Sequence, residues 1–289
     1  MQLRPRRSVL YMPGANARAL DKARTLPADA LILDLEDAVS PDAKEGARRQ
    51  VVEAVAQGGY GRREVIVRVN GLNTPWGKDD VAAVASSGAD AILFPKMESP
   101  EQVQAAVEAL DAAGGLPDLP VWIMAETPRG MLHIDAIAGA SPRLAAIVMG
   151  TSDLAKELRV RHTLDRIGLI TALSLGVMAA RTHGLDILDG VYLDLSDDQG
   201  FRAACEQGRD MGFDGKTLIH PKQVGSANEV FAPAAKDVEN ARHLIEAWEQ
   251  AKAAGKGVAV VDGKLVENLH VEEARRTLAV AEAIQALGE

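Results

Sequence analysis

Two acidic residues, Glu126 and Asp153, have the type and spacing of ligands for a divalent metal ion. Each follows a short apolar run. If these runs are neighbouring parallel strands about 4.8 Å apart, the two carboxylates can reach one ion. No cysteine is near and no histidine pair has ligand spacing, so Mg²⁺ or Mn²⁺ is favoured over zinc. In the alternative interpretation both are helix-start carboxylates, because Thr127-Pro128 and Thr151-Ser152 resemble first turns.

Arg68 lies in the apolar motif VIVRVNG, where an unpaired buried charge would be very costly. Its partner is either an internal carboxylate or a substrate carboxylate or carbonyl held by paired N–H donors. The motif LDLEDAV places Asp34, Glu36 and Asp37 at the end of another run, where they would repel one another unless shared with Arg68 or a metal. We predict that Glu36 and Asp37 orient Arg68 and metal-bound water, with helix capping as the alternative for Asp37.

Three lysines have competing interpretations. Lys96, in the motif FPK, could form a Schiff base with a carbonyl substrate, or could simply be exposed or salt-bridged. Lys216 is expected at the start of a strand, away from any site at the strand ends. Lys22 belongs to a basic stretch that could meet the phosphates of a long cofactor or face solvent.

These residues need a scaffold that brings many strand ends to one rim. Eight short runs, apolar on both faces, alternate with amphipathic helical stretches, and this alternation predicts parallel strands buried under helices. Eight repeats favour a closed α/β barrel, the (β/α)8 TIM barrel, whose active site lies at the C-terminal strand ends. The expected strands are Ser8–Met12, Ala30–Leu35, Glu64–Val69, Ala91–Phe94, Val121–Ala125, Leu144–Met149, Gly190–Leu193 and Lys216–Ile219.

We predict two parts, a catalytic barrel over residues 1–230 and a helix–hairpin–helix cap over residues 231–289. The expected cap elements are a helix over Ala234–Ala254, strands Val258–Val261 and Lys264–Val266 around Asp262-Gly263, and a helix over Val271–Leu287. The cap could cover the mouth of its own barrel or reach a neighbouring subunit.

Length and charge narrow the classes of function. A chain of 289 residues suits one barrel of this type, which can exceed about 250 residues. The net charge of −9 is unlike that of a nucleic-acid-binding protein, which is typically basic. Because an acidic protein repels anions, an anionic substrate would need local positive charge at its binding site. The single cysteine, Cys205, excludes an internal disulfide and predicts a cytoplasmic protein. Pro13 interrupts the first apolar run, which is too short for a signal peptide or membrane span.

Seven motifs in order resemble one family. They are SVLYMPGAN, LILDLEDAVSPDAK, VIVRVNG, GADAILFPKMES, IMAETPRG, MGTSDLAKEL and GKTLIHPKQV. Together they resemble the citrate lyase β-subunit-like CoA-ester lyases of the HpcH/HpaI aldolase superfamily. That group includes malyl-CoA lyases, citramalyl-CoA lyases and (3S)-malyl-CoA thioesterases. The resemblance extends from about Ser8 to Ala283.

The resemblance implies a role for each matching residue. Glu126 of AETPRG and Asp153 of GTSDL would hold Mg²⁺, and Arg68 of RVN would bind the keto-acid end of the substrate. Lys22 and Asn16, at the helix after the first strand, would contribute to CoA binding. The family also implies a homotrimer or hexamer in which the C-terminal segment covers a neighbour's active site.

One motif departs from the pattern. Related lyases carry an aspartate on the cap in a motif like GKMID, whereas this chain reads GKLVEN and places Glu267 there. The extra methylene matters because proton transfer is sensitive to misplacement by about 1 Å. The departure keeps open a variant in which the cap carboxylate activates water.

The reaction predicted first is Mg²⁺-dependent cleavage of (3S)-malyl-CoA or citramalyl-CoA into acetyl-CoA and a 2-keto acid. Arg68 would stabilise the developing charge, and Glu267 would transfer the proton, with Asp37 completing the catalytic set and Glu36 and Glu126 facing the substrate. Three alternatives stay open. They are hydrolysis of the same thioester to malate and CoA, a citrate lyase β subunit acting on an acyl-carrier thioester, and a metal-free Schiff-base aldolase using Lys96. No nucleic-acid or membrane partner is expected.

Overall fold

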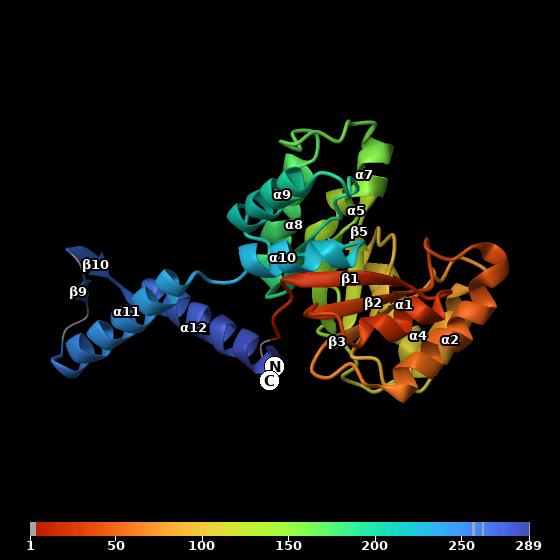
Figure 1. The fold of residues 1–289 in the computed structure, drawn as a ribbon, viewed down its shortest axis with the longest axis horizontal. Helices are drawn as coiled ribbons and strands as arrows, with labels where there is room; N and C mark the ends of the chain where they lie inside the picture. Colours follow the sequence, from red (N-terminus) through yellow and green to blue (C-terminus); the bar gives the residue numbers. More distant parts are fainter. Residues whose placement is uncertain (1–3, 256–257, 262, 289) are drawn as a thin grey trace. The chain divides into compact units, whose positions relative to one another are not determined.

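The computed structural model describes residues 4–255, 258–261 and 263–288. The chain divides into two compact units (Figure 1), one formed by Arg6–Phe231 and one formed mainly by the residues from Ala232 onward. Within the described residues, no helix combines the length and apolar character needed to cross a membrane.

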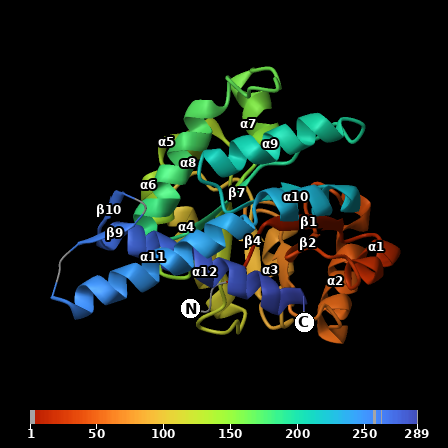
Figure 2. The same cartoon turned by 60° about the vertical axis from the view of Figure 1, so that its left-hand side comes forward.

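The first unit is a closed barrel of eight parallel strands, in sequence order, with β1 also pairing with β8. This confirms the predicted (β/α)8 fold. Helices surround the strands on the outside (Figures 1 and 2). The strands are β1 (Ser8–Pro13), β2 (Ala30–Asp34), β3 (Glu64–Arg68), β4 (Ala91–Phe94), β5 (Val121–Ala125), β6 (Leu144–Met149), β7 (Asp186–Asp189) and β8 (Gly215–Leu218).

Ten α-helices and two short 3₁₀ turns, η1 (Pro41–Ala43) and η2 (Pro221–Gln223), connect or follow these strands in the described part of the unit. The helices are α1 (Ala17–Ala23), α2 (Lys44–Gln57), α3 (Gly77–Val84), α4 (Pro100–Ala112), α5 (Pro128–Leu132), α6 (Ile134–Ala138), α7 (Thr151–Leu158), α8 (Ile170–His183), α9 (Asp198–Asp210) and α10 (Val224–Val230).

Local capping signals fix where the helices near the strand ends begin. The side chain of Asn16 caps α1 by accepting a hydrogen bond from the N–H of Ala19. Thr127 caps α5 in the same way and is followed by Pro128, whose missing N–H costs nothing at the first helical position. Because Glu126 lies between the end of β5 and this cap, its backbone is held from both sides.

The prediction for the seventh strand was wrong. The barrel strand is Asp186–Asp189, and the expected run Gly190–Leu193 follows it as irregular chain. The β-branched and aromatic letters of that run match strand propensity, but Gly190 already approaches Thr151, where a Cβ would lie 2.2 Å from the hydroxyl oxygen. The chain therefore leaves the barrel at Gly190. As a result, Asp189 is the acidic residue that ends β7.

Asp189 forms a buried ion cluster with Lys216 and Arg166. The Nζ of Lys216 donates to Asp189 at 2.7 Å, and Nη1 of Arg166 donates to both carboxylate oxygens at 2.7 and 2.8 Å. Asp189 is fully buried and Lys216 is 1% exposed. Lys216 lies early in β8, as predicted, and its side chain forms an ion pair within this cluster.

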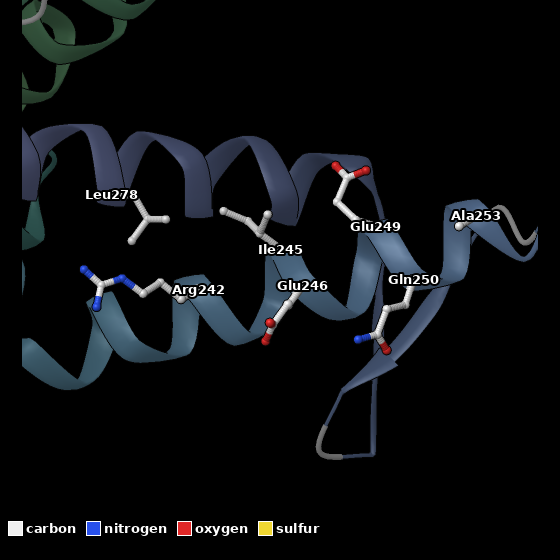
Figure 3. A pocket seen from close by; sticks show the side chains of 7 residues that line it. All are labelled: Arg242, Ile245, Glu246, Glu249, Gln250, Ala253 and Leu278. Atoms are coloured by element: carbon white, nitrogen blue, oxygen red, sulfur yellow. The ribbon is translucent and has the colours of Figure 1, made fainter.

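The second unit contains a helix–hairpin–helix, with α11 (Ala235–Ala253), β9 (Ala259–Val261), β10 (Lys264–Val266) and α12 (Asn268–Gly288). Of the predicted turn, Gly263 has a φ of +76° and Asp262 lies outside the described residues. Ala259, Val266 and Val271 form a small core. Ile245 and Leu278 face each other between the two helices in a groove of about 700 Å³ (Figure 3). The cap role of this unit stays a prediction.

We expect Asp189→Asn to lower the free energy of unfolding by about 3 to 5 kcal/mol, because it leaves Lys216 buried without its counter-charge. Chemical denaturation at neutral pH measures the difference from wild type. Asp210→Asn is the matched control, since Asp210 pairs with Arg209 at the surface. That control should leave the free energy of unfolding nearly unchanged.

The loss in Asp189→Asn should also depend on pH. Burial alone would raise the pKa of Asp189, but Lys216 and Arg166 outweigh it and lower that pKa. The stabilisation is therefore complete above the unfolded carboxyl's pKa of about 4 and is lost as pH falls through the lower folded value. The gap between wild type and variant should be constant near neutrality and narrow below about pH 4. A gap that widens in acid would contradict the assignment.

Candidate active site

A cavity of about 330 Å³ opens among residues at the C-terminal strand ends, where the barrel fold predicts the site. It brings together Arg68, Glu126, Asp153 and Asp37 from four different strand–helix connections. Glu36 lines a neighbouring cavity of about 260 Å³ together with Lys96. The complete lining of the first cavity is Tyr11, Asp34, Asp37, Ala38, Arg68, Met124, Glu126, Met149, Gly150, Thr151, Ser152, Asp153, Val191, Thr217 and Ile219.

Glu126 follows β5 and is only 1% exposed. Its Oε1 accepts a hydrogen bond from the backbone N–H of Lys96 at 2.8 Å. Burial, followed by the charge of Glu36, raises the pKa of Glu126 to about 7. That hydrogen bond and Arg68 oppose the rise, and Asp153 adds a smaller increase. A carboxylate in this position is short of positive charge, and a divalent cation would supply it.

Gly150 makes room for Glu126. A Cβ at position 150 would lie 2.3 Å from Cβ of Glu126 and 2.6 Å from its Oε2. Real side chains do not approach so closely, so any larger residue would displace the carboxylate. This requirement was not predicted, although a glycine directly before the TSD triplet is visible in the sequence.

Asp153 lies in the first turn of α7, half-buried and at the same cavity. Its carboxylate makes no hydrogen bond or ion pair with the described residues, so it is free to bind a ligand. No group of three or more His, Cys, Asp or Glu in the described ranges could hold a metal ion. Two carboxylates with water and substrate oxygens fit Mg²⁺, which usually keeps several waters.

Arg68 ends β3 beside Asp34, which ends β2 in the matching register. Its Nε and Nη2 donate to the two oxygens of Asp34, both at 2.6 Å. Nη1 lies 2.9 Å from Oε2 of Glu36 and 3.6 Å from Oδ2 of Asp37. The principal partner of Arg68 is therefore an internal carboxylate, one of the two alternatives that the sequence left open.

Asp34 was one of three carboxylates expected near Arg68, but Glu36 and Asp37 were the two predicted to orient it. Beside the two bonds from Arg68, it accepts the N–H groups of Glu36 at 2.9 Å and Ala38 at 3.0 Å. Asp34 thus fixes both the arginine and the loop that carries Glu36. Strand alternation offered a signal, since Asp34 and Arg68 end adjacent strands on the inside of the barrel.

Lys44 ties the same loop from α2. Its Nζ donates to the carbonyl oxygens of Leu35 and Glu36 at 2.9 and 2.7 Å and to Oδ1 of Asn70 at 2.8 Å. Burial lowers the pKa of Lys44, against the pull of nearby carboxylates. Glu36 is held in a buried position in this way, and burial, with the charge of Asp37, raises its pKa against Arg68 and Lys96.

Lys96 is half exposed and adopts a φ of +51°. Its Nζ lies 3.5 Å from Oε1 of Glu36. Burial alone would lower the pKa of Lys96, but Glu36, Glu126 and other carboxylates outweigh it and raise that pKa. A Schiff-base lysine needs the neutral amine, so this environment makes Lys96 a poor nucleophile.

Of three further predicted residues, two lie at α1 of the barrel and do not line the described cavity, and the third belongs to the second unit. Asn16 caps α1, and Lys22 is exposed in the last turn of that helix. Glu267 is exposed between β10 and α12, where its N–H donates to Nδ1 of His270 at 3.0 Å. Their predicted roles in CoA binding and proton transfer stay predictions.

Comparison with known proteins gives two kinds of match. The profile of the family described as HpcH/HpaI aldolase/citrate lyase matches residues 7–221. A (3S)-malyl-CoA thioesterase of Cereibacter sphaeroides is 56% identical over 287 residues, which cover 99% of this chain and 98% of that protein. An L-malyl-CoA/beta-methylmalyl-CoA lyase of the same species is 36% identical over 307 residues, covering 98% and 96%.

One structurally similar protein has been solved with ligands bound. The protein CitE from Mycobacterium tuberculosis, in complex with magnesium, acetoacetate and coenzyme A, superimposes with a TM-score of 0.75. It is 26% identical and covers 96% of this chain and 98% of its own.

Gly150→Ala should weaken Mg²⁺ binding by about 10- to 100-fold, because the added methyl group displaces Glu126. Calorimetric titration of the purified protein with Mg²⁺ measures the change. The matched control is Gly46→Ala in α2, where a new Cβ would meet nothing within 4 Å. Unchanged Mg²⁺ affinity in Gly150→Ala would contradict the role of Glu126 as a metal ligand.

Proposed function

Because the chain belongs to the HpcH/HpaI aldolase/citrate lyase family, we propose that it hydrolyses CoA thioesters, with (3S)-malyl-CoA as its substrate. The observation that carries the proposal is the 56% identity to a (3S)-malyl-CoA thioesterase across nearly the whole of both chains. The lyase relative is 36% identical over a similar extent. The comparisons therefore support the hydrolytic alternative better than the carbon–carbon cleavage that was predicted first.

In this proposal, Glu126 and Asp153 hold Mg²⁺. Support comes from a buried carboxylate with a raised pKa, a second carboxylate without a protein partner, and the magnesium in the CitE complex. When bound, the ion would act as a Lewis acid toward oxygens of the acid half of the substrate. Use of Mn²⁺ in its place stays a prediction.

Arg68 supplies the positive charge that an acidic protein needs for an anionic substrate. Its pairing with Asp34 fixes the guanidinium plane and leaves Nη1, which lies near Met124 of the cavity lining, outside that pair. Such preorganised donors stabilise negative charge on oxygen more effectively than mobile ones do. Glu36 and Asp37, near the same edge, help to hold the arginine in place.

Glu267 is proposed to activate the hydrolytic water from a neighbouring subunit in a homotrimer or hexamer. Its carboxylate is exposed, and three exposed apolar side chains surround it in sequence, which favours burial against a partner. These are Val260 at 68%, Leu265 at 55% and Leu269 at 58% exposure. Water adds to the thioester carbonyl, the C–S bond breaks, and the CoA thiol leaves with malate as the other product.

Two other candidates have less support. The surroundings of Lys96 keep its amine protonated, which opposes the Schiff-base aldolase. Dependence on an acyl-carrier partner, as in a citrate lyase β subunit, would require that the purified chain fail on free CoA thioesters.

Purified protein with (3S)-malyl-CoA and Mg²⁺ should release free CoA and malate in equal amounts, because water attacks the thioester. Thiol titration and product chromatography measure both. EDTA and Glu126→Gln should each abolish activity, since both remove the metal ion. If the products are glyoxylate and acetyl-CoA and no free thiol appears, the enzyme is a lyase and the hydrolysis proposal is wrong. Full activity in EDTA would overturn the metal assignment.

The position of Glu267 can be tested by mixing subunits. Glu267→Gln and Glu126→Gln should each be inactive, but hybrids purified from co-expression with two tags should regain part of the activity. The reason is that an intact Glu267 of one subunit would serve the intact metal site of another. Hybrids no more active than either parent would contradict a shared site.

A further inference from the structure

The floor of the active-site cavity contains an aromatic residue that the proposed mechanism has not used. Tyr11 lies on β1, packs against the residues that fill the barrel interior, and lines the cavity. The guanidinium carbon of Arg68 lies 4.8 Å from the centre of the Tyr11 ring. Tyr11 therefore supports the face of the arginine while its hydroxyl group reaches across the barrel.

Two hydrogen-bond donors converge on one poor acceptor at this point. The Tyr11 hydroxyl lies 3.9 Å from Sδ of Met124, and Nη1 of Arg68 lies 3.5 Å from the same sulfur. A thioether is a weak acceptor, whereas a carboxylate or an oxyanion is a strong one. The two donors are thus oriented toward a position where an oxygen would bind them much better than sulfur does.

One protein carboxylate lies near Nη1 of Arg68: Oε2 of Glu36 is 2.9 Å away but makes no hydrogen bond within the described residues. The nearby oxygens of Asp34 and Oε1 of Glu126 already have donors. Both oxygens of Asp34 are occupied by Arg68 and by two backbone N–H groups. Oε1 of Glu126 accepts from the N–H of Lys96. The Tyr11 hydroxyl meets only the Met124 sulfur among the described residues, so a bound molecule can supply the oxygen acceptor that it lacks.

We infer that the Tyr11 hydroxyl and Nη1 of Arg68 form a two-donor subsite for one negatively charged or strongly polarised oxygen of the substrate's acid half. On ligand binding, the oxygen takes the position at which both donors now meet Met124. Tyr11 is then a substrate-binding residue that selects acyl groups carrying such an oxygen.

A phenol suits this position for an electrostatic reason. The cavity already contains several carboxylates, and a neutral donor adds a hydrogen bond without adding charge. Burial raises the pKa of Tyr11, with Arg68 opposing, so the hydroxyl keeps its proton and remains a donor. Desolvation in the cavity strengthens a bond of this kind to a charged acceptor.

The inference rests on the proposed function for the identity of the substrate, so its test includes a measurement without turnover. Tyr11→Phe keeps the ring under Arg68 and removes only the hydroxyl. It should lower kcat/KM on (3S)-malyl-CoA by about 10- to 100-fold and raise the Kd of L-malate with Mg²⁺ by a similar factor, as expected for a bond to a charged oxygen. Steady-state kinetics and calorimetry measure the two quantities.

Tyr60→Phe is the matched control. Tyr60 is also buried, and its hydroxyl has no hydrogen-bond partner in the part of the chain that the structure describes. Its ring lies 5.4 Å from the guanidinium of Arg24. It does not line the cavity. Tyr60→Phe should leave both quantities within about twofold of wild type. Mg²⁺ affinity and Tm should be unchanged in Tyr11→Phe, which separates loss of a donor from damage to the site.

The outcomes distinguish the two ideas. If malyl-CoA is not hydrolysed but L-malate binding still weakens only in Tyr11→Phe, the proposed function fails and the subsite stands. If wild type does not bind L-malate, or Tyr11→Phe binds it as tightly as wild type does, the subsite is overturned. Equal losses in Tyr11→Phe and Tyr60→Phe would also overturn it.

Discussion

The paired hydrogen bonds between Arg68 and Asp34 are the interaction on which the site depends. Both side chains are buried at the ends of adjacent strands, and each would be very costly there alone. The strand register brings them together, so the barrel supplies the geometry before any ligand arrives. Asp34 then fixes the Glu36 loop through backbone N–H groups, and Lys44 holds that loop from the other side. One ion pair therefore couples the scaffold to the cavity.

Negative charge is in excess around this ion pair. Acidic side chains outnumber basic ones at the cavity and its edge, with Asp34, Glu36, Asp37, Glu126 and Asp153 near Arg68 and Lys96. Burial turns that excess into raised pKa values for Glu126 and Glu36. A divalent cation bound as proposed would relieve this repulsion and would help an acidic protein to accept an anionic substrate. Together with Arg68, such an ion would supply the local positive charge that an anionic substrate needs at a protein of net charge −9.

Prediction from sequence worked where residues report on their own surroundings. Runs apolar on both faces identified seven strands to within a residue or two, and the ordered motifs identified the family. The seventh strand was misplaced because Gly190-Val191-Tyr192-Leu193 has strand propensity, while the close approach of Gly190 to Thr151 ends the barrel strand before it. Asp34, Gly150 and Lys44 were missed as positioning residues because each acts through a contact distant in sequence. Arg68 was predicted correctly as a site residue because a charged side chain in an apolar strand stands out in the sequence.

Cleavage and hydrolysis of a malyl thioester need much of the same machinery. In the proposed site, Mg²⁺ and Arg68 would hold the acid half for either reaction, so those residues cannot decide between the two. The decision depends on where a water and a proton-transferring carboxylate meet the thioester. In this chain that carboxylate is proposed to be Glu267, one methylene longer than the aspartate expected of a lyase. The extra methylene changes the reach of that carboxylate, and proton transfer is sensitive to misplacement by about 1 Å. The length of the Glu267 side chain would then decide between cleavage and hydrolysis, on a barrel that can otherwise support both reactions.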